Sequence, residues 1–498
     1  MSSIAVIGAG FSGLSAAACL AQGGHQVTVL EKNCQPGGRA RKFEEQGFVF
    51  DMGPSWYWMP DVFEKFYNRF GKTSSDFYDL KRLNPSYRIF FSNKDIMDVP
   101  AGVEALCAMF EKREAGTGAH LKKFLEEGKY KYEVGIQRLV YKPGLSITEL
   151  MDAQLFKGLF KLHIFKSLSS YVRKNFRDPG LIQLLEFPVL FLGASPAKTP
   201  ALYSLMNYAD MALGTWYPMG GMCKIVEAMH KIADQQGTTF EFNSEVDAME
   251  LNAVAIKSLL VNGSQRKFDY VVASADYHHI EQKLLPPSFR KYSEAYWQKR
   301  VMAPSSLIFY VGVSKKLKSL LHHNLFFDQD FTLHTKEIYE NPAWPTNPLF
   351  YVCCPSKTDP VVAPAGCENV FILIPTAPGL HDSEGIREKY FKLVISRLET
   401  LTGESIQEHI IYKKSYAHKD FISDYHAFKG NAYGLANTIL QTANLKPSIV
   451  NKKVNNLFYT GQLTVPGPGV PPSIISGQVV AKELMDRDIR RREVNKEK

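Results

Sequence analysis

The sequence has no run of apolar residues long enough to cross a membrane. A spanning helix needs roughly 18–20 such residues, and the nearest candidate, 181–194, is interrupted by Glu186 and Pro188. The N-terminus has no basic segment ahead of its apolar run, so it does not match a secretory signal. We therefore predict a protein that can lie on a membrane but does not cross one.

Cysteine is scarce and shows no pairing pattern. The chain has 7 cysteines, an odd number, and no two of them form a C-x-x-C pair. A disulfide framework is not expected, and we predict a reducing, cytoplasmic location. The adjacent Cys353 and Cys354 lie in a strand-like run and are expected to fill core space. The histidine pairs 278–279 and 322–323 have no third ligand at a suitable spacing, so no metal site is predicted.

Several motifs of other enzyme classes are also absent. The chain has no Gly-x-Ser-x-Gly elbow and no Walker loop, which argues against esterases and nucleoside triphosphatases. It has no internal repeats and no low-complexity segment. A net charge of +9 spread over 498 residues is small, so we interpret it as surface solvation and expect no nucleic-acid partner.

The first 31 residues carry the strongest positive signal. An apolar run, 4–7, leads into Gly8-Ala9-Gly10-Phe11-Ser12-Gly13, an Ala-rich helical segment and a second strand-like run that ends on Glu31. Strand, glycine turn, helix, strand and acid in this order form the βαβ dinucleotide fingerprint. The pattern therefore predicts a bound dinucleotide.

Each position of this fingerprint has a physical task. Gly8 permits the tight turn, Gly10 lets the backbone approach the pyrophosphate, and Gly13 allows the helix to pack closely on the strand. The helix N-terminus offers unpaired N–H groups to the phosphates. The Glu31 carboxylate can accept hydrogen bonds from both ribose hydroxyls. The predicted contacts of this part are Gly8, Ala9, Gly10, Phe11, Ser12, Gly13, Glu31 and Lys32.

Two further segments resemble cofactor loops. Gly37-Gly38-Arg39 lets the backbone pass close to a ligand while a cation meets phosphate. Near the end of the chain a strand, 456–461, runs into a Pro/Gly-rich loop, 466–472, and a helical segment, 473–488. Such a loop between two elements is expected to shape itself against a ligand. The charged tail, 487–498, is expected to be a solvated, frayed end, with membrane contact as the alternative.

The rest of the chain has a mixed pattern. Residues 80–214 are expected to be largely helical, with amphipathic segments at 103–114 and 121–131. Helices are also expected at 224–236 and 384–401. The segment 239–276 alternates like a small sheet, and strands are expected at 306–313, 349–354 and 370–375.

Together these motifs resemble the flavin amine-oxidase and carotenoid-desaturase superfamily. Within it, three segments are similar to bacterial phytoene desaturases, over essentially the whole chain: Phe50-Asp51-Met52-Gly53-Pro54-Ser55-Trp56, Tyr217-Pro218-Met219-Gly220-Gly221-Met222, and Gly461 to Gly477. The segments 185–194 and 275–279 resemble the branch found in flavobacteria.

The resemblance implies an α/β fold: a Rossmann-like FAD-binding domain of the amine-oxidase type, with an interleaved α+β substrate-binding domain. The FAD-binding domain is expected to comprise 1–80, 215–290 and 415–498, and the substrate- and membrane-facing domain 81–214 and 291–414. The resemblance adds these FAD contacts: Gly38, Arg39, Gly53, Pro54, Ser55, Val246, Gly461, Gln462, Val470 and Pro471.

The implied activity is desaturation of phytoene towards lycopene in successive steps, on a peripheral membrane protein. An allylic CH2–CH2 unit gives a hydride to the flavin and a proton to a base. Oxygen or a quinone is expected as the electron acceptor. No catalytic base is assigned, because Asp276 is interpreted as structural or cofactor-side rather than as a proton acceptor. The Phe/Leu/Tyr-rich region 150–215 is a candidate tunnel wall and membrane face, with an ordinary helical core as the alternative.

The chain departs from the family pattern in one loop. Gln462 and Leu463 replace small residues and Val465 replaces a histidine, so the role of that histidine cannot be transferred. Two alternatives stay open at this point. One is a related carotenoid oxidoreductase, such as a hydroxycarotenoid desaturase, an isomerase or an oxidase of terminal methyl groups. The other is a non-catalytic prenyl-binding escort on the same fold.

Overall fold

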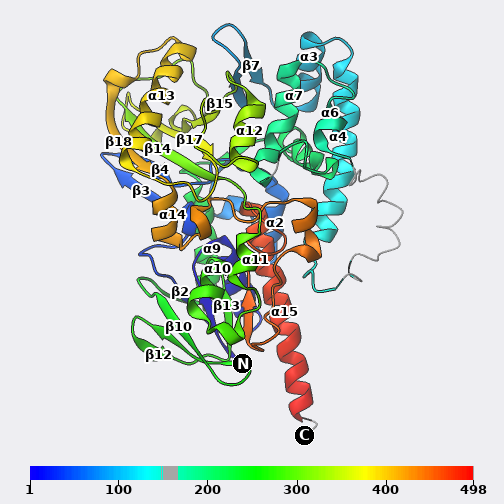
Figure 1. Ribbon diagram of the computed structural model, residues 1–498, viewed down its shortest axis with the longest axis vertical. Coiled ribbons are helices and arrows are strands. Elements are labelled where there is room, and N and C mark those ends of the chain that lie inside the picture. Colours follow the sequence, from blue (N-terminus) through cyan, green and yellow to red (C-terminus); the bar gives the residue numbers. More distant parts are fainter. Residues whose placement is uncertain (147–148, 150–165, 194, 497–498) are drawn as a thin grey trace.

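The computed structural model describes residues 1–146, 149, 166–193 and 195–496. Its elements form two stacked halves: a parallel sheet with its helices lies in the lower half of Figure 1, and a larger sheet with a helical layer beside it lies in the upper half. Both chain ends lie in the lower half. Among the described helices, none is both long and apolar enough to cross a membrane.

The parallel sheet is assembled from distant parts of the chain. Its five strands lie in the order β19-β13-β1-β2-β9, and every neighbouring pair is parallel. The strands are β1 (Ser3–Ile7), β2 (Gln26–Leu30), β9 (Thr239–Glu241), β13 (Tyr270–Ala273) and β19 (Leu457–Tyr459). The beginning, middle and end of the chain therefore share one sheet, which confirms the Rossmann-like fold.

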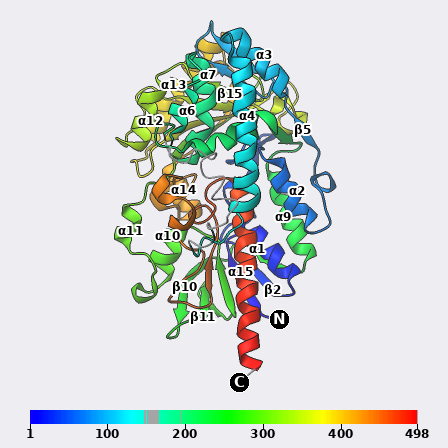
Figure 2. The ribbon, with the colours of Figure 1, turned by 90° about the vertical axis from the view of Figure 1, so that its right-hand side faces the viewer.

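Three helices pack beside this sheet: α1 (Phe11–Gln22), α9 (Cys223–Gln235) and α15 (Val470–Lys496). Helix α1 packs against both of the others, and Figure 2 shows α15 running alongside it. The small side chains of α1 are almost all buried, which permits this close approach.

Helix α15 is longer than the sequence indicated, because it begins at Val470 and continues through the charged tail to Lys496. The prediction of a frayed end was therefore wrong up to residue 496, whereas residues 489–494 are solvent-exposed as expected. Three i,i+4 ion pairs lie along this part of the helix, Lys482–Asp486, Glu483–Arg487 and Asp488–Arg492. Pairs at this spacing stabilise exposed helical turns.

The segment 239–276 does not form one small sheet. Only β10 (Val246–Leu251), β11 (Ile256–Val261) and β12 (Ser264–Arg266) do so, while β9 and β13 belong to the parallel sheet. All residues of β13 are buried, as expected for a strand in the interior of a parallel sheet.

A seven-stranded sheet dominates the upper half, in the order β18-β14-β17-β16-β15-β6-β7. Its strands are β6 (Tyr87–Phe90), β7 (Ile96–Val99), β14 (Ser305–Val313), β15 (His323–Phe326), β16 (Phe350–Cys353), β17 (Glu368–Thr376) and β18 (Ile410–Tyr416). Helix α13 (Glu384–Thr402) covers one face, where Phe309 and Ile372 join its core. Because side chains alternate along a strand, Ile308 and Leu373 face the opposite way.

The expectation of a largely helical region 80–214 was wrong at its start. Residues 80–99 form β5 (Leu80–Arg82), β6 and β7, and β6 completes the seven-stranded sheet by pairing with β15. Helices then follow as expected: α3 (Val103–Arg113), α4 (Thr117–Val134), α6 (Leu168–Val172), α7 (Pro179–Glu186) and α8 (Leu205–Asn207).

The remaining described elements are short. Two small antiparallel pairs are formed by β3 (Lys42–Glu45) with β4 (Phe48–Asp51), and by β5 with β8 (Trp216–Pro218). The other helices are α2 (Pro60–Asn68), α10 (Tyr277–His279), α11 (Glu294–Gln298), α12 (Phe331–Tyr339) and α14 (His418–Tyr425). The domain boundaries expected from the sequence stay a prediction.

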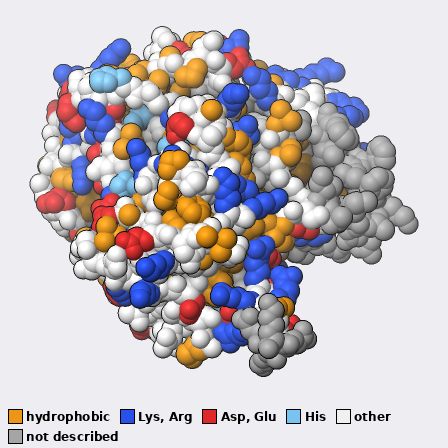
Figure 3. Space-filling model, turned by 60° about the horizontal axis from the view of Figure 1, so that its bottom comes forward, with side chains coloured by type: hydrophobic (Ala, Val, Ile, Leu, Met, Phe, Trp, Pro, Cys, Tyr) orange, Lys and Arg blue, Asp and Glu red, His pale blue; other side chains and the backbone are white. Residues whose placement is uncertain are grey.

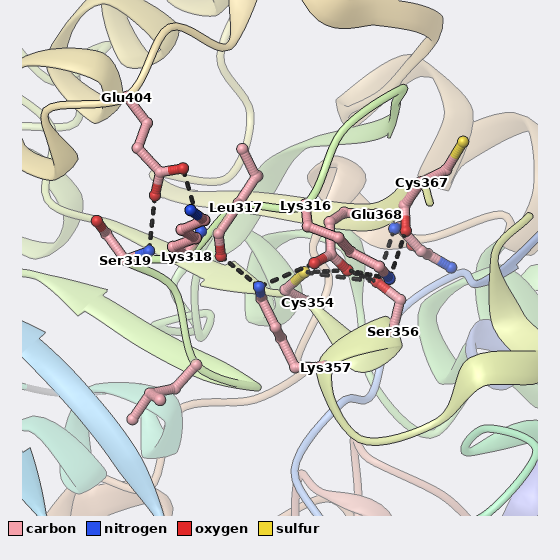
Figure 4. Close-up of polar contacts among 12 residues, drawn as sticks. Lys316, Leu317, Lys318, Ser319, Cys354, Ser356, Lys357, Cys367, Glu368 and Glu404 are labelled. Carbon is pink, nitrogen blue, oxygen red and sulfur yellow. Dashed lines mark hydrogen bonds and ion pairs between the residues drawn. The ribbon is translucent and has the colours of Figure 1, made fainter. Parts of the chain in front are cut away.

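One buried carboxylate near the start of β17 is held by two lysines (Figure 4). Glu368 is fully buried; its Oε1 lies 2.8 Å from Lys357 Nζ, and its Oε2 accepts hydrogen bonds from Ser356 Oγ at 2.5 Å and Lys316 Nζ at 3.4 Å. Burial raises the pKa of Glu368, but the Lys357 and Ser356 contacts and the charge of Lys316 outweigh it and leave this pKa lowered.

We expect Glu368→Gln to lower the free energy of unfolding by about 3 kcal/mol at pH 7, because it leaves the half-buried ammonium group of Lys357 without its anion. The lowered pKa stabilises the fold above the pKa of an unfolded Glu, about 4.3, and this stabilisation is lost as pH falls through the folded-state pKa. The difference between variant and wild type should therefore shrink in acid. Urea unfolding at pH 7 and at a pH below the pKa of an unfolded Glu measures this difference, with Glu384→Gln at an exposed position as control. A difference that is the same at both pH values would contradict the predicted pH dependence.

Candidate functional site

One cavity of about 390 Å³ lies where the ends of both sheets meet. It collects almost all of the predicted contact residues, although they come from opposite ends of the chain. Those that line it are Gly8, Gly10, Phe11, Ser12, Glu31, Lys32, Gly38, Arg39, Gly53, Pro54, Ser55, Val246, Gly461, Gln462, Val470 and Pro471. The two that do not line it are Ala9 and Gly13.

The glycine turn contains three glycines with three different requirements. Gly8 has φ +100°, which disfavours any side chain. A Cβ on Gly13 would lie 2.0 Å from the Gly8 carbonyl oxygen, so this residue must be glycine for α1 to pack on the turn. Gly10 has an ordinary extended backbone, φ −74°, and a Cβ there would meet no protein atom within 4 Å. Only a ligand in the cavity would require glycine at this position, as a dinucleotide pyrophosphate does.

The N-terminus of α1 points at the same place. Gly10 is its N-cap, and no side chain of the described residues caps the first turn. The free N–H groups and the positive end of the helix dipole suit a phosphate. This cradle fits the pyrophosphate of FAD.

Glu31 is held rigidly at the end of β2. Its Oε2 accepts a hydrogen bond from Ala9 N–H at 2.7 Å, and its Oε1 accepts bonds from the N–H and the side-chain amide of Asn33 at 2.9 and 2.8 Å. Ala9 thus orients the acid rather than lining the cavity. Since a carboxylate has about four lone-pair sites, these bonds leave about one for a ribose hydroxyl. The expected contact with both hydroxyls stays a prediction.

Arg39 provides a half-buried cation at the cavity wall. Its Nη2 donates to the Asn431 carbonyl oxygen at 3.2 Å, its guanidinium lies 5.0 Å from the centre of the Tyr425 ring, and its Nε–H is buried without a partner. Burial lowers the pKa of Arg39, and the charge of Asp276 opposes this effect. A half-buried guanidinium with a free N–H is well suited to bind an anion.

Two motifs of the resemblance contact each other behind this wall. Asp51 accepts hydrogen bonds from Met222 N–H at 2.7 Å and Cys223 N–H at 2.9 Å, which anchors the start of α9. Burial raises the pKa of Asp51 to about 6, although these two N–H groups oppose the shift. A Cβ on Gly221 would lie 2.8 Å from Asp51 Oδ2, and one on Gly53 would lie 2.6 Å from the Arg39 carbonyl oxygen. Close packing of this kind places residues 53–55 on the cavity.

The C-terminal segment closes the cavity from the other side. Gly461 has φ +113°, and its N–H donates to Ser476 Oγ at 3.0 Å. Gln462 reaches Asn431 Oδ1 at 3.3 Å, and Val470 begins α15. In α15, a Cβ on Gly477 would lie 2.3 Å from the Ser12 carbonyl oxygen, so the two terminal helices touch at this glycine.

Asp276 serves the backbone. Its Oδ1 accepts from His279 N–H and its Oδ2 from Phe428 N–H, each at 3.2 Å. Burial raises the pKa of Asp276, and the Phe428 N–H and the charge of Arg39 oppose this. Asp276 thus holds the backbone of His279 and Phe428 beside the cavity. Its interpretation as a structural or cofactor-side residue stays a prediction.

Sequence reasoning missed much of the cavity wall. Aromatic and apolar residues of the seven-stranded sheet and the segment after it form this part of the lining: Ile308, Tyr351, Leu373, Tyr416, Phe421, Tyr425 and Tyr433. No local motif marks them. From the predicted tunnel region 150–215, Met206 lines the cavity; residues 150–165 and 194 lie outside the described part.

A second, smaller pocket adjoins the cavity. It shares Tyr351, Leu373 and Tyr433 with it and continues between hydrophobic side chains. Its further lining comprises Phe187, Leu190, Pro304, Leu325, Phe327, His334, Thr335, Ile338, Tyr339, Leu349, Phe350 and Pro375. The cavity and the pocket thus form one site, with a polar, glycine-rich end in the cavity and an apolar end in the pocket.

The two histidine pairs have different surroundings in the structure. His278 Nε2 lies 2.8 Å from Glu294, and His279 stacks on His426 at 3.9 Å between ring centres. His322 and His323 lie close to Cys353 instead. Sequence spacing did not predict Cys353 as a neighbour, because the pairing of β15 with β16 brings it close to the two histidines.

Comparisons with known proteins agree with this geometry. The family model for flavin containing amine oxidoreductase matches residues 11–485. The carotenoid 3,4-desaturase of Haloarcula japonica is 40% identical over 97% of this chain and 98% of its own length. The zeta-carotene-forming phytoene desaturase of Myxococcus xanthus is 31% identical over 97% and 93%. The structure of wild-type putrescine oxidase shares the fold with a TM-score of 0.61, at 13% identity over 97% of this chain and 99% of that one. The chain therefore belongs to the flavin-containing amine oxidoreductase family, among its carotenoid desaturases, and is an FAD-dependent oxidoreductase.

Proposed function

We propose that this protein is a phytoene desaturase, which introduces successive double bonds into phytoene on the way to lycopene. Relatives named as desaturases of carotenoids and of diapophytoene support the reaction class. The resemblance of residues 50–56 and 217–222 to phytoene desaturases supports the substrate. Membership of an oxidoreductase family argues against the non-catalytic escort.

The observation that carries the proposal is the apolar pocket beyond Tyr351, Leu373 and Tyr433. A hydrocarbon offers no hydrogen-bonding group, so it must be held by shape and by buried area, at about 25 cal/mol per Å². Burying several hundred Å² gives on the order of 10 kcal/mol, but leaving a membrane costs a similar amount. Specificity therefore depends on the length and shape of an apolar channel, which this pocket extends.

The residues of the chain have separable tasks in such a reaction. Bound FAD supplies the hydride acceptor. The glycine turn and Arg39 would hold its pyrophosphate, and Glu31 its ribose. The aromatic wall of Tyr351 and Tyr433 would exclude water and align one CH2–CH2 unit of the polyene.

A bulky substitution in the shared wall tests the channel. Leu373→Trp is expected to retain FAD but to reduce desaturation about 100-fold or more, because a misplaced substrate loses its alignment with the cofactor. Leu373→Met, which conserves volume, is the matched control. Purified proteins would be incubated with phytoene in liposomes and the polyenes identified. Equal rates for wild type and Leu373→Trp would show that the substrate channel does not pass this wall. Phytoene left unconsumed by the flavin-loaded wild type would refute the proposed function.

A second candidate is desaturation of another carotenoid, favoured by the 40% identity to a carotenoid 3,4-desaturase. The same incubation with a more desaturated or hydroxylated carotenoid discriminates between the two. Phytoene left intact while such a polyene is consumed would decide for the second candidate.

We also propose peripheral membrane association in the cytoplasm, with oxygen or a quinone as electron acceptor. Figure 3 shows a face on which hydrophobic side chains gather among lysines and arginines. Exposed large hydrophobic residues include Leu440, Leu445 and Val301. Val301 lies near the first two, because its N–H donates a hydrogen bond to Oε1 of Gln441. A face on which apolar and basic side chains are mixed suits an anionic bilayer surface. Co-flotation of the protein with liposomes, and incubations with and without each acceptor, test these points.

A further inference from the structure

Two paired strands bring three metal-binding side chains together behind the cavity wall. In the antiparallel pair β15–β16, His323 lies directly opposite Cys353, and His322 immediately precedes β15. One ligand atom from each of the three residues lies within 4.8 Å of the other two. All three side chains are buried.

The hydrogen bonds of the two histidines leave one nitrogen of each ring unused. His322 Nδ1 lies 2.8 Å from Thr358 Oγ1, and His323 Nδ1 lies 2.6 Å from the Tyr351 hydroxyl. That hydroxyl donates onward to Ser55 Oγ at 2.9 Å, so it accepts from His323 Nδ1–H. The Nε2 atom of His323 then carries a free lone pair. Both Nε2 atoms are buried without a hydrogen-bond partner.

This arrangement has the features of an outer shell around metal ligands. A metal-bound imidazole typically donates its other N–H to an oxygen, which fixes the ring and the tautomer. Trp56 stacks on the His323 ring at 4.2 Å between centres, and Tyr217 packs edge-on against His322. The rings are thus held in place from several sides.

Neighbouring residues of the same types are satisfied differently. Cys354 lies with its Sγ 3.6 Å from both Ser356 Oγ and Glu368 Oε2, in the lysine-bound cluster of Figure 4. In His334, Nε2 faces the Pro375 carbonyl oxygen at 2.9 Å and Nδ1 accepts from Leu349 N–H at 3.0 Å. Both ring nitrogens of this buried histidine therefore have partners, unlike those of His322 and His323.

We propose that His322, His323 and Cys353 form a binding site for one cation of borderline-soft character, with Zn²⁺ as the ligand of choice. Neutral imidazoles and one thiolate are donors that Zn²⁺ prefers, and three protein ligands with a fourth open position are a common set. Binding would displace the Cys353 thiol proton to solvent as the Zn–S bond forms, without any change in oxidation state. The site is separate from the FAD cavity, from which Trp56 and Tyr351 divide it, and sequence spacing gave no sign of it.

Metal content and a spectroscopic probe test the proposal on the flavin-loaded, full-length protein. Dialysed against Zn²⁺ and then buffer, the wild type should retain about one equivalent per chain. With Co²⁺ in its place, ligand-field bands should appear at wavelengths longer than flavin absorbs, together with a sulfur-to-cobalt charge-transfer band. Cys353→Ser should remove the charge-transfer band and weaken binding at least tenfold.

The adjacent thiol supplies a matched control. Cys354→Ser removes a buried sulfur from the same strand end but should leave the cobalt spectrum and the Zn²⁺ content unchanged. Thr358→Val, which removes only the partner of His322 Nδ1, should weaken Zn²⁺ about 10–100-fold. Wild-type protein that retains no Zn²⁺ and shows no cobalt bands would overturn the proposal, as would equal loss in Cys353→Ser and Cys354→Ser. Both readouts are independent of the proposed substrate.

Discussion

Gly10→Val is expected to produce a folded protein that purifies without flavin. The backbone of Gly10 is extended, with φ −74°, and its Cβ would meet no protein atom within 4 Å. The added Cβ therefore introduces neither backbone strain nor a clash inside the protein. The new side chain would fill the space in front of the α1 N-terminus, where the pyrophosphate of FAD would lie. Loss of flavin with an intact fold is the expected result.

Two measurements distinguish this outcome from misfolding. Visible absorbance gives the flavin content per chain, and circular dichroism with thermal unfolding reports the fold. Gly385→Val is the matched control, because Gly385 also lacks a positive φ and its Cβ would meet nothing within 4 Å. A Gly10→Val protein that retains stoichiometric flavin would show that the phosphates lie elsewhere.

Gly477→Val should instead abolish the folded state together with the flavin. A Cβ at this position would lie 2.3 Å from the Ser12 carbonyl oxygen and 2.7 Å from Ser15 Cβ, both in helix α1. Neither neighbour can move freely, because Ser15 Oγ also donates to the Ile474 carbonyl oxygen at 2.7 Å. Overpacking of this kind costs about 1–3 kcal/mol per site and more where backbone must shift, so we expect at least about 3 kcal/mol.

The yield of soluble protein and its urea-unfolding midpoint measure this effect. Arg490→Val, on an exposed turn of the same helix, is the control and should change the free energy of unfolding by about 0.5 kcal/mol or less. If Gly477→Val folds normally and binds FAD, the contact between the first and last helices does not hold the cavity together. Gly10→Val thus tests the space that the ligand needs, and Gly477→Val tests the space that the packing of the two helices needs.

The cofactor-binding half was predictable from the amino-acid sequence at the level of local elements. Gly8, Gly13 and Glu31 are recognisable because the turn, the helix packing and the acid at the strand end depend on residues within about 30 positions. The same holds for α3, α4 and α13, whose apolar periodicity is local. The paired motifs at 50–56 and 217–222 were also visible, although not the hydrogen bonds from Asp51 that join them.

The pairing of segments that are distant in the chain became visible in the folded structure alone. Strand pattern did not reveal that β9 and β13 enter the parallel sheet, or that residues 80–99 supply strands to the larger one, because alternation specifies faces and not partners. For the same reason the wall formed by Tyr351, Leu373 and Tyr433 and the approach of Cys353 to His323 were hidden. Such contacts depend on the register between strands far apart in the chain, which local spacing cannot encode.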